Sequence, residues 1–301
     1  MPDITQIESE LGINTEAAIV EPIQHPILLE KDIHFHIKRD DLLHPIISGN
    51  KWRKLKYTLL HALTKGHEHL ISMGGAYSNH LHALAYVGHK LNLKTTGLIR
   101  GEEPAVDNQT LADLKSWGMN LEFVSRSAFR ELRNYRASDA APAKQYNGYW
   151  IPEGGSSQEA LRGVSEILKE INMDFDTLTL ACGTGTTLAG IAKSLPSTKR
   201  VLGFSALKGG GFLEKDIKKL LRTKGMPNWS INFDYHFGGF AKTNEELLSF
   251  IETFQTETNI PLEPLYNGKM LFGIFDLINN DRFKKGHTII AIHTGGLQGN
   301  R

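Results

Sequence analysis

Two short apolar runs in this chain each end in a glycine-rich turn and continue into a helical pattern. The first run, residues 69–73, leads into a turn at 74–80 and a helix over 81–91. The second run, residues 177–181, leads into a turn at 182–187 and another helix. Units of strand, turn and helix are typical of parallel sheets, in which ligands bind beside the carboxyl ends of the strands. The pattern therefore predicts an α/β fold whose functional site lies at these turns.

The other periodic segments predict two blocks of structure. Further strands are expected at 33–38, 94–100, 121–124, 200–205 and 288–292. Further helices are expected at 108–117, 127–135 and 159–171. A chain of 301 residues is long enough for two domains with separate cores. We expect a small α/β domain over 46–148 and a large one formed by 1–45 together with 149–301, which holds the second glycine turn.

A cationic helix start is expected near residue 50, where Ser48 or Asn50 can act as the cap. It places Lys51, Arg53 and Lys54 in a first turn whose free backbone N–H groups already make the potential positive. An anion bound there would explain the arrangement. A lysine at such a site should have a lowered pKa, and a lysine that is neutral part of the time can form a Schiff base with a carbonyl. The alternative is a solvated basic helix face.

The second glycine turn is rich in groups that bind phosphate. It contains two glycines and three threonines: Gly183, Thr184, Gly185, Thr186 and Thr187. At a strand-to-helix turn these supply backbone N–H groups and hydroxyls to a phosphate. No Lys-Ser or Lys-Thr pair follows, and the third glycine is misplaced for a dinucleotide fingerprint. The turn therefore predicts a phosphate of mononucleotide size or smaller, although a purely structural turn stays an alternative.

Polar side chains also follow the other glycine turns. Ser78 and Asn79 stand at the start of the helix after the first turn, where they either contact a ligand or serve merely as helix caps. The segments 262–270 and 288–296 likewise set polar groups beside glycines. His34 and His36 share the polar face of one strand, but no third ligand stands nearby, so no metal site is predicted.

Charge and cysteine content limit the class of partner. Lys and Arg number 34 against 33 Asp and Glu, so the net charge of +1 creates no field that would attract nucleic acid or an anionic membrane. The chain shows no leader pattern at its start and no apolar stretch long enough to span a bilayer. The one cysteine, Cys182, fits a reducing compartment. We expect a cytoplasmic protein with a small-molecule partner.

A lysine able to form a Schiff base, a phosphate-binding turn and polar turns at strand ends are what pyridoxal 5′-phosphate requires. On these residues the chain resembles the family of 1-aminocyclopropane-1-carboxylate deaminase and D-cysteine desulfhydrase. The resemblance runs from 38–41 to 293–296 and includes the motifs at 49–55, 74–80 and 264–269. It implies the tryptophan-synthase-β-like fold called fold type II, with two open α/β domains, the cofactor in the cleft between them, and a homodimeric assembly.

The resemblance also implies how the cofactor is held. Lys51 would bind it covalently and later move protons on the substrate. Lys54 and the turn at 183–187 would hold its phosphate. Asn79 would hydrogen-bond its phenolic oxygen. Thr294 would face its pyridine nitrogen, and because a hydroxyl can donate to that nitrogen, we expect the ring to stay largely neutral.

Two further residues would act on the substrate, a small amino acid. Ser78 would contact its carboxylate or assist proton transfer, and Tyr266 would lie over it. The chain departs from the deaminase pattern at His80 and His82, where the deaminase has glutamine and arginine, and at Ala291, where it has a tyrosine near the cofactor. The loop at 235–240 also lacks the usual proline.

These departures rank the expected activities. D-cysteine desulfhydration is placed ahead of aminocyclopropane-carboxylate ring opening, because the ring has no α-proton and needs an additional group to open it. Both reactions release ammonia and a 2-oxo acid. β-Replacement or racemisation is a second possibility within the cofactor class. A non-catalytic protein that binds a phosphate metabolite on the same scaffold is the alternative of a different class.

Overall fold

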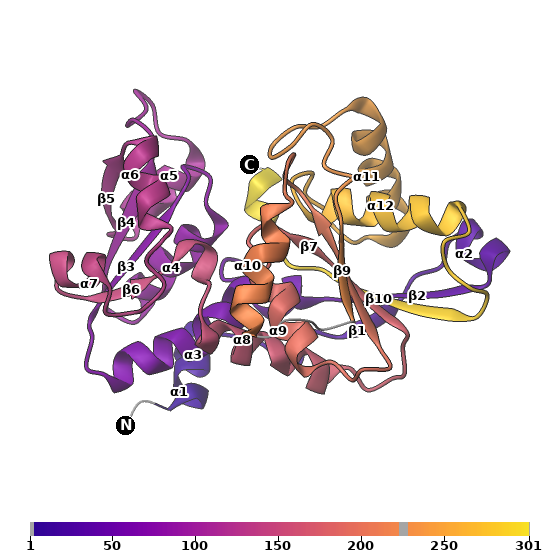
Figure 1. Ribbon diagram of the computed structural model, residues 1–301, viewed down its shortest axis with the longest axis horizontal. Coiled ribbons are helices and arrows are strands. Elements are labelled where there is room, and N and C mark those ends of the chain that lie inside the picture. Colours follow the sequence, from indigo (N-terminus) through magenta and orange to yellow (C-terminus); the bar gives the residue numbers. More distant parts are fainter. Residues whose placement is uncertain (1–2, 223–227, 301) are drawn as a thin grey trace.

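The computed structural model of the chain describes residues 3–222 and 228–300. These residues form two sheets that lie towards opposite ends of the long axis of the molecule (Figure 1). One sheet has four strands in the order β5-β4-β3-β6, and the other has six in the order β1-β2-β10-β7-β8-β9. Two sheets of mostly parallel strands, each flanked by helices, confirm the expected α/β class.

The four-stranded sheet is parallel throughout. Its strands are β3 (His69–Gly74), β4 (Lys94–Arg100), β5 (Asn120–Val124) and β6 (Tyr149–Ile151). Its helices are α4 (Asn79–Lys90), α5 (Gln109–Ser116), α6 (Arg126–Leu132) and α7 (Ala141–Tyr146). Every residue of β3 is buried, because helices cover both faces of a parallel sheet and its central strands read as continuous apolar runs.

The six-stranded sheet is parallel except for β1, which runs antiparallel to β2 at its edge. Its strands are β1 (Val20–Pro22), β2 (Ile33–Lys38), β7 (Thr177–Cys182), β8 (Arg200–Ser205), β9 (Trp229–Asn232) and β10 (His287–Ile292). Its two faces have separate cores. One face is covered by α2 (Pro26–Lys31), α11 (Glu245–Thr258) and α12 (Asn267–Asn279). The other face is covered by α8 (Gln158–Ser165), α9 (Thr186–Ser194) and α10 (Phe212–Leu221).

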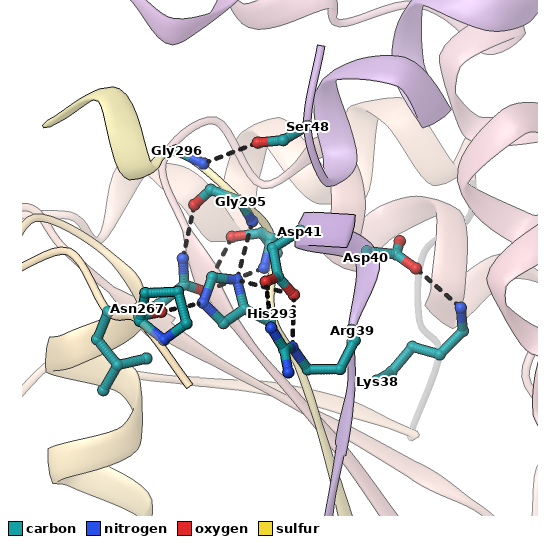
Figure 2. A network of polar contacts seen from close by, with 12 residues as sticks. Lys38, Arg39, Asp40, Asp41, Ser48, Asn267, His293, Gly295 and Gly296 are labelled. Atoms are coloured by element: carbon teal, nitrogen blue, oxygen red, sulfur yellow. Dashed lines mark hydrogen bonds and ion pairs between the residues drawn. The ribbon is translucent and has the colours of Figure 1, made fainter. Parts of the chain in front are cut away.

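Helix α3 (Asn50–Thr64) joins the two halves: with α1 (Ile4–Leu11) it packs in the core of the four-stranded half, and it also packs on α8 of the other half. It packs so closely on α8 that a Cβ at Gly163 would lie 1.9 Å from the carbonyl oxygen of Arg53. Buried charges tie it to the large sheet. Arg53 Nη2 lies 3.0 Å from Asp40 Oδ1. Lys38 Nζ lies 2.9 Å from the same oxygen, as Figure 2 shows. Since buried charges are tolerated only when paired, this cluster holds the start of α3 in one place.

Short 3-10 helices complete the described part of the chain. They are η1 (Asp40–Leu43), η2 (Glu153–Gly155), η3 (Glu166–Glu170) and η4 (Leu297–Asn300). No helix within 3–222 and 228–300 is long and apolar enough to cross a bilayer. The strand β6 belongs to the four-stranded sheet although it follows residue 148, where the small domain was expected to end. The division into domains stays a prediction, and its second boundary cuts this sheet.

The expected strands are all present, within one or two residues of their predicted ends. The expected helices are also present, although the one over 159–171 divides into α8 and η3. The predicted cap of α3 is wrong. The N-cap is Gly49, whose φ of 59° is left-handed, and neither Ser48 nor Asn50 caps the helix with its side chain.

Candidate active site

A cleft of about 680 Å³ lies between the two sheets. Its wall is formed by the start of α3 and by the turns after β3, β7 and β10. It contains the predicted site residues Lys51, Lys54, Ser78, Asn79, Gly183, Thr184, Gly185, Thr187, Tyr266 and Thr294. Thr186 lies just behind this wall, where its hydroxyl is 3.0 Å from that of Thr184. The structure thus brings together residues that the sequence separates by more than two hundred positions.

The start of α3 is fastened to the turn after β10. The backbone N–H of Asn50 donates to the carbonyl oxygen of Thr294 at 3.3 Å, and the N–H of Gly49 donates to the backbone carbonyl oxygen of Asp40 at 2.9 Å. The side chains expected to cap the helix serve this junction instead. Ser48 Oγ accepts from the N–H of Gly296 at 3.3 Å, and Asn50 Nδ2 donates to Thr187 Oγ1 at 3.1 Å. Asn50 therefore links α3 to the threonine-rich turn.

Lys51 and Lys54 have the lowered pKa values that the sequence predicts, although the main cause is a different one. Loss of water lowers the pKa of Lys51 to about 8, against a partial opposing effect of Glu263. Burial lowers the pKa of Lys54 to about 7, and the charge of Lys51 lowers it further. Lys51 Nζ donates to Asn50 Oδ1 at 2.6 Å. A lysine with a pKa near 8 is neutral often enough to act as a nucleophile and as a base.

The threonine-rich turn has the geometry of a phosphate cradle. The N-cap of helix α9 is Gly185, whose φ of 73° is left-handed, and no side chain caps the first N–H groups of the helix. Two positions of the cradle have too little space for any side chain. A Cβ at Gly185 would lie 2.6 Å from Ile217, and one at Gly154 would lie 2.7 Å from Thr184. With Lys54 on the same cleft wall, backbone N–H groups, hydroxyls and an amine lie together in an arrangement that can hold an anion.

Ser78 has one of the two roles considered for it, that of helix cap, and its contact with a ligand stays a prediction. Its side-chain oxygen accepts from the N–H of Leu81 at 3.2 Å, so it caps α4. Because a serine hydroxyl also carries a hydrogen, Ser78 can still donate into the cleft. Asn79 follows as the first residue of α4 and lies close to the last turn, since a Cβ at Gly296 would be 2.8 Å from its Nδ2.

His80 is neutral in this structure. Ser72 Oγ donates to the carbonyl oxygen of Ile151 at 2.8 Å, so it accepts from His80 Nε2 at 2.9 Å, and the ring hydrogen sits on Nε2. Burial and the charges of Lys54 and Lys51 lower the pKa of His80 to about 3. His80 cannot act as an acid near neutral pH.

Tyr266 covers one side of the cleft. Its ring would be 3.2 Å from a Cβ at Gly183 and has its centroid 5.8 Å from that of Phe240. Burial and the carboxylates of Glu263 and Glu153 raise the pKa of Tyr266 well above its usual value. Its phenol therefore stays protonated, so it can donate a hydrogen bond or its proton but cannot serve as a base in the resting site.

Sequence reasoning missed the residues behind Thr294. The hydroxyl and the backbone N–H of Thr294 both donate to Asn267 Oδ1 at 3.1 Å. His293 Nε2 donates to the carbonyl oxygen of Pro261 at 2.7 Å, and its Nδ1 accepts from Gly295. Figure 2 shows this cluster around the last turn, with Asp41 beside His293. An Asn at a helix start and a Glu four residues earlier, Glu263, are the sequence signals that could have identified it.

Ala291 does not lie where the comparison with the deaminase pattern placed it. It is 1% exposed and packs in the core between β10 and α12. It borders a small space that it shares with Asn267, Met270 and His293, behind the cleft wall. The deaminase pattern has a tyrosine near the cofactor at this position, whereas the side chain of Ala291 faces the core and is not part of the cleft wall.

The match to a family model is decisive for the identity of the site. Residues 21–295 match the model described as "Pyridoxal-phosphate dependent enzyme". The chain belongs to this family. It therefore binds pyridoxal phosphate and is an enzyme, as predicted, and the alternative of a non-catalytic binding protein is wrong. The cradle, Lys54 and the partly neutral Lys51 fit that cofactor.

The chain is also similar to individual relatives whose names state an activity. The chain is 32% identical to a "Putative 1-aminocyclopropane-1-carboxylate deaminase" from Pyrococcus horikoshii, over 92% of this chain and 90% of the relative. It is 31% identical to the mitochondrial "Bifunctional D-cysteine desulfhydrase/1-aminocyclopropane-1-carboxylate deaminase" of Arabidopsis thaliana, over 87% and 72%. The crystal structure of an "ACC deaminase homologue" matches with a TM-score of 0.76 and 30% identity, over 100% of this chain and 96% of that one. The expected fold type II is confirmed.

Proposed function

We propose that this pyridoxal-phosphate dependent enzyme is a lyase that converts D-cysteine to pyruvate, sulfide and ammonia. The observation that carries the proposal is the set of titratable groups on the inner cleft wall. Lys51 has a pKa of about 8, whereas His80 stays neutral and Tyr266 stays protonated. Lys54 belongs to the phosphate cradle. One base near the substrate is therefore available, which is what elimination from D-cysteine requires.

The residues of the chain have distinct tasks in this reaction. Bound pyridoxal phosphate supplies the electron-withdrawing group that makes the α-hydrogen of an amino acid acidic. Lys51 holds the cofactor and then takes the α-proton. The hydroxyl of Ser78 donates to the substrate carboxylate. Asn79 orients the cofactor through its phenolic oxygen, and Tyr266 covers the substrate and limits the access of water.

The leaving group decides between D-cysteine and the cyclopropane. Thiolate leaves readily from the β-carbon once the α-proton is removed, so no further acid is needed. The cyclopropane has no α-proton, and opening it requires a second group beside Lys51. Tyr266 is the candidate for that group. The names of the relatives support deamination of 1-aminocyclopropane-1-carboxylate as the second candidate function.

The proposal extends to the assembly and location of the enzyme. We infer a homodimer that acts on a small amino acid in the cytoplasm, without nucleic acid or membrane as a partner. The near-neutral net charge supports the last point. Size-exclusion chromatography with light scattering measures the assembly, and a monomer at micromolar concentration would contradict the dimer.

The test compares substrates on one preparation of holoenzyme. Sulfide and pyruvate are measured with D-cysteine and with L-cysteine, and 2-oxobutanoate is measured with 1-aminocyclopropane-1-carboxylate. We expect sulfide from D-cysteine at a kcat/KM at least tenfold above that for the cyclopropane. The variant Lys51→Ala should lose both activities, while Lys65→Ala, at an exposed position at the other end of α3, should keep them. Equal or faster turnover of the cyclopropane would overturn the ranking.

A further inference from the structure

The side-chain amide of Asn267 can adopt one orientation only. Its nitrogen donates to Glu263 Oε1 at 3.0 Å. It also donates to the carbonyl oxygen of Gly295 at 2.8 Å (Figure 2). Its oxygen accepts two hydrogen bonds from Thr294, through the backbone N–H and the hydroxyl. A flipped amide would set its oxygen against two acceptors and its nitrogen against the N–H of Thr294. Because Asn267 is fully buried, water cannot compensate for those mismatches.

This orientation determines where the hydroxyl hydrogen of Thr294 points. The amide oxygen of Asn267 lies 3.1 Å from Thr294 Oγ1 and has no hydrogen to give, so the hydroxyl must donate to it. Thr294 also lines the cleft. What its hydroxyl presents to the cleft is therefore its remaining lone pair. A ligand atom at that point finds a hydrogen-bond acceptor rather than a donor.

A carboxylate stands behind the amide. Glu263 accepts four hydrogen bonds, from the backbone N–H groups of Leu265, Tyr266 and Asn267 and from the Asn267 amide. Burial raises the pKa of Glu263 to about 7, while the donors on both carboxylate oxygens oppose that rise and favour the ionised form, which prevails above this pH. In a buried chain of hydrogen bonds each bond polarises the next, so the ionised carboxylate of Glu263 strengthens Thr294 Oγ1 as an acceptor.

We propose that Asn267 is a positioning residue: it takes the hydroxyl hydrogen of Thr294, so that Thr294 holds the ring nitrogen of the cofactor in its protonated form. This inference rests on the binding mode that the resemblance implies, in which Thr294 faces that nitrogen. The sequence led to the opposite expectation, a neutral ring nitrogen that accepts a hydrogen bond from the hydroxyl of Thr294. A protonated ring withdraws electrons more strongly and makes the α-hydrogen of a bound amino acid more acidic.

The ring nitrogen itself is the direct readout. The cofactor-free protein is reconstituted with pyridoxal phosphate that carries ¹⁵N in the ring, and the ¹⁵N chemical shift is recorded between pH 6 and 9. Protonation moves a pyridine nitrogen far upfield, so the two forms are distinct without any substrate. We expect the protonated shift in the unmodified holoenzyme and in Thr294→Ser, which keeps the hydroxyl.

Two variants test the arrangement and one controls for it. Thr294→Val removes the acceptor and Asn267→Ala frees the hydroxyl to donate, so both should show the neutral shift. Thr179→Val removes a buried hydroxyl, bonded to the carbonyl of Leu202, from the neighbouring strand β7 and should stay protonated. If Asn267→Ala does not fold, Thr294→Val decides the matter. Thermal unfolding of each variant separates loss of fold from loss of the proton.

The outcomes separate the two proposals. A neutral nitrogen in the unmodified holoenzyme, or a protonated one in either Thr294→Val or a folded Asn267→Ala, would overturn the role of Asn267. A protonated nitrogen in an enzyme that releases no sulfide from D-cysteine would overturn the proposed substrate and leave this inference standing. A labelled cofactor that gives only the signal of the free compound would overturn both.

Discussion

Gly49 lies directly against the backbone of Thr294: a Cβ at Gly49 would be 2.0 Å from the carbonyl oxygen of Thr294. The two residues are at opposite ends of the site in sequence. Their contact sets the start of α3, and with it Lys51, beside the last turn of the chain. Glycine is required for two reasons, the lack of space and the left-handed φ of 59°.

The contact predicts a large effect of one methyl group. Gly49→Ala should lower the free energy of unfolding by about 3–5 kcal/mol, because a backbone clash is added to an unfavourable φ. The matched control is Gly66→Ala, which follows α3 with a φ of 76° and has no atom within 4 Å of the added Cβ. It should cost only about 1–2 kcal/mol. Urea denaturation of both variants measures the difference, and equal losses would show that the clash relaxes freely.

Borohydride should attach the cofactor to the peptide that contains Lys51. The expectation follows from an amine with a pKa near 8 in the same cleft as the phosphate cradle. Peptide mass spectrometry after reduction locates the modified lysine. Lys51→Ala should remove both the modification and the visible absorption band. Modification of Lys54 in the unmodified protein would show that the two lysines have been assigned to the wrong tasks.

Lys54 should make the cofactor-free protein more stable as the pH rises. Its pKa is about 7 in the folded chain and near 10.5 when unfolded, so between these values the unfolded chain binds the extra proton. The folding penalty is full below pH 7 and is lost above about 10.5. Lys54→Met should therefore raise stability at pH 7 by on the order of 3 kcal/mol and have little effect near pH 10.5.

The exposed Lys65 provides the comparison for that experiment. Lys65→Met alters the same helix at an exposed position and should change stability by less than about 0.5 kcal/mol at either pH. Urea denaturation at several pH values gives the curves. A stability gain in Lys54→Met that does not depend on pH would mean that packing, and not the buried charge, is responsible.

Tyr266→Phe should separate the two candidate reactions. Elimination from D-cysteine relies on Lys51, so sulfide release should fall by less than about tenfold. Ring opening needs a second proton-transfer group, and its loss typically costs about 10²–10⁴-fold in rate. Sulfide and 2-oxobutanoate are measured with the same preparation. Equal losses for both substrates would assign Tyr266 to binding rather than to proton transfer.

The sequence was sufficient for the β–α units and for the turns that carry the site. Strand β3 and strand β7 are continuous apolar runs, and each ends in glycines that mark a turn into a helix. The carboxyl ends of parallel strands hold the site, so the sequence also predicted which turns matter. It placed Lys51, Lys54 and the turn at 183–187 in one site before any contact between them was known.

The sequence was misleading where an effect depends on which way a side chain points. Ser48 and Asn50 are good capping residues, but they bond to Gly296 and Thr187 because those segments lie against the helix start. Ala291 aligns with a residue expected near the cofactor, yet its side chain faces the core beside Asn267. Both errors arise from partners far away in the chain.

By itself, then, the sequence determined the elements, the glycine turns and the chemical groups of the site, because these depend on neighbours a few residues apart. The tertiary structure decided how far those groups are removed from water and which partners hold their protons. Burial lowers the pKa of Lys51 and of Lys54, and Ser72 selects the tautomer of His80. The hydroxyl of Thr294 became an acceptor towards the cleft because Asn267 takes its hydrogen. Proton positions follow from desolvation and from hydrogen-bond partners, and packing brings these from remote parts of the chain.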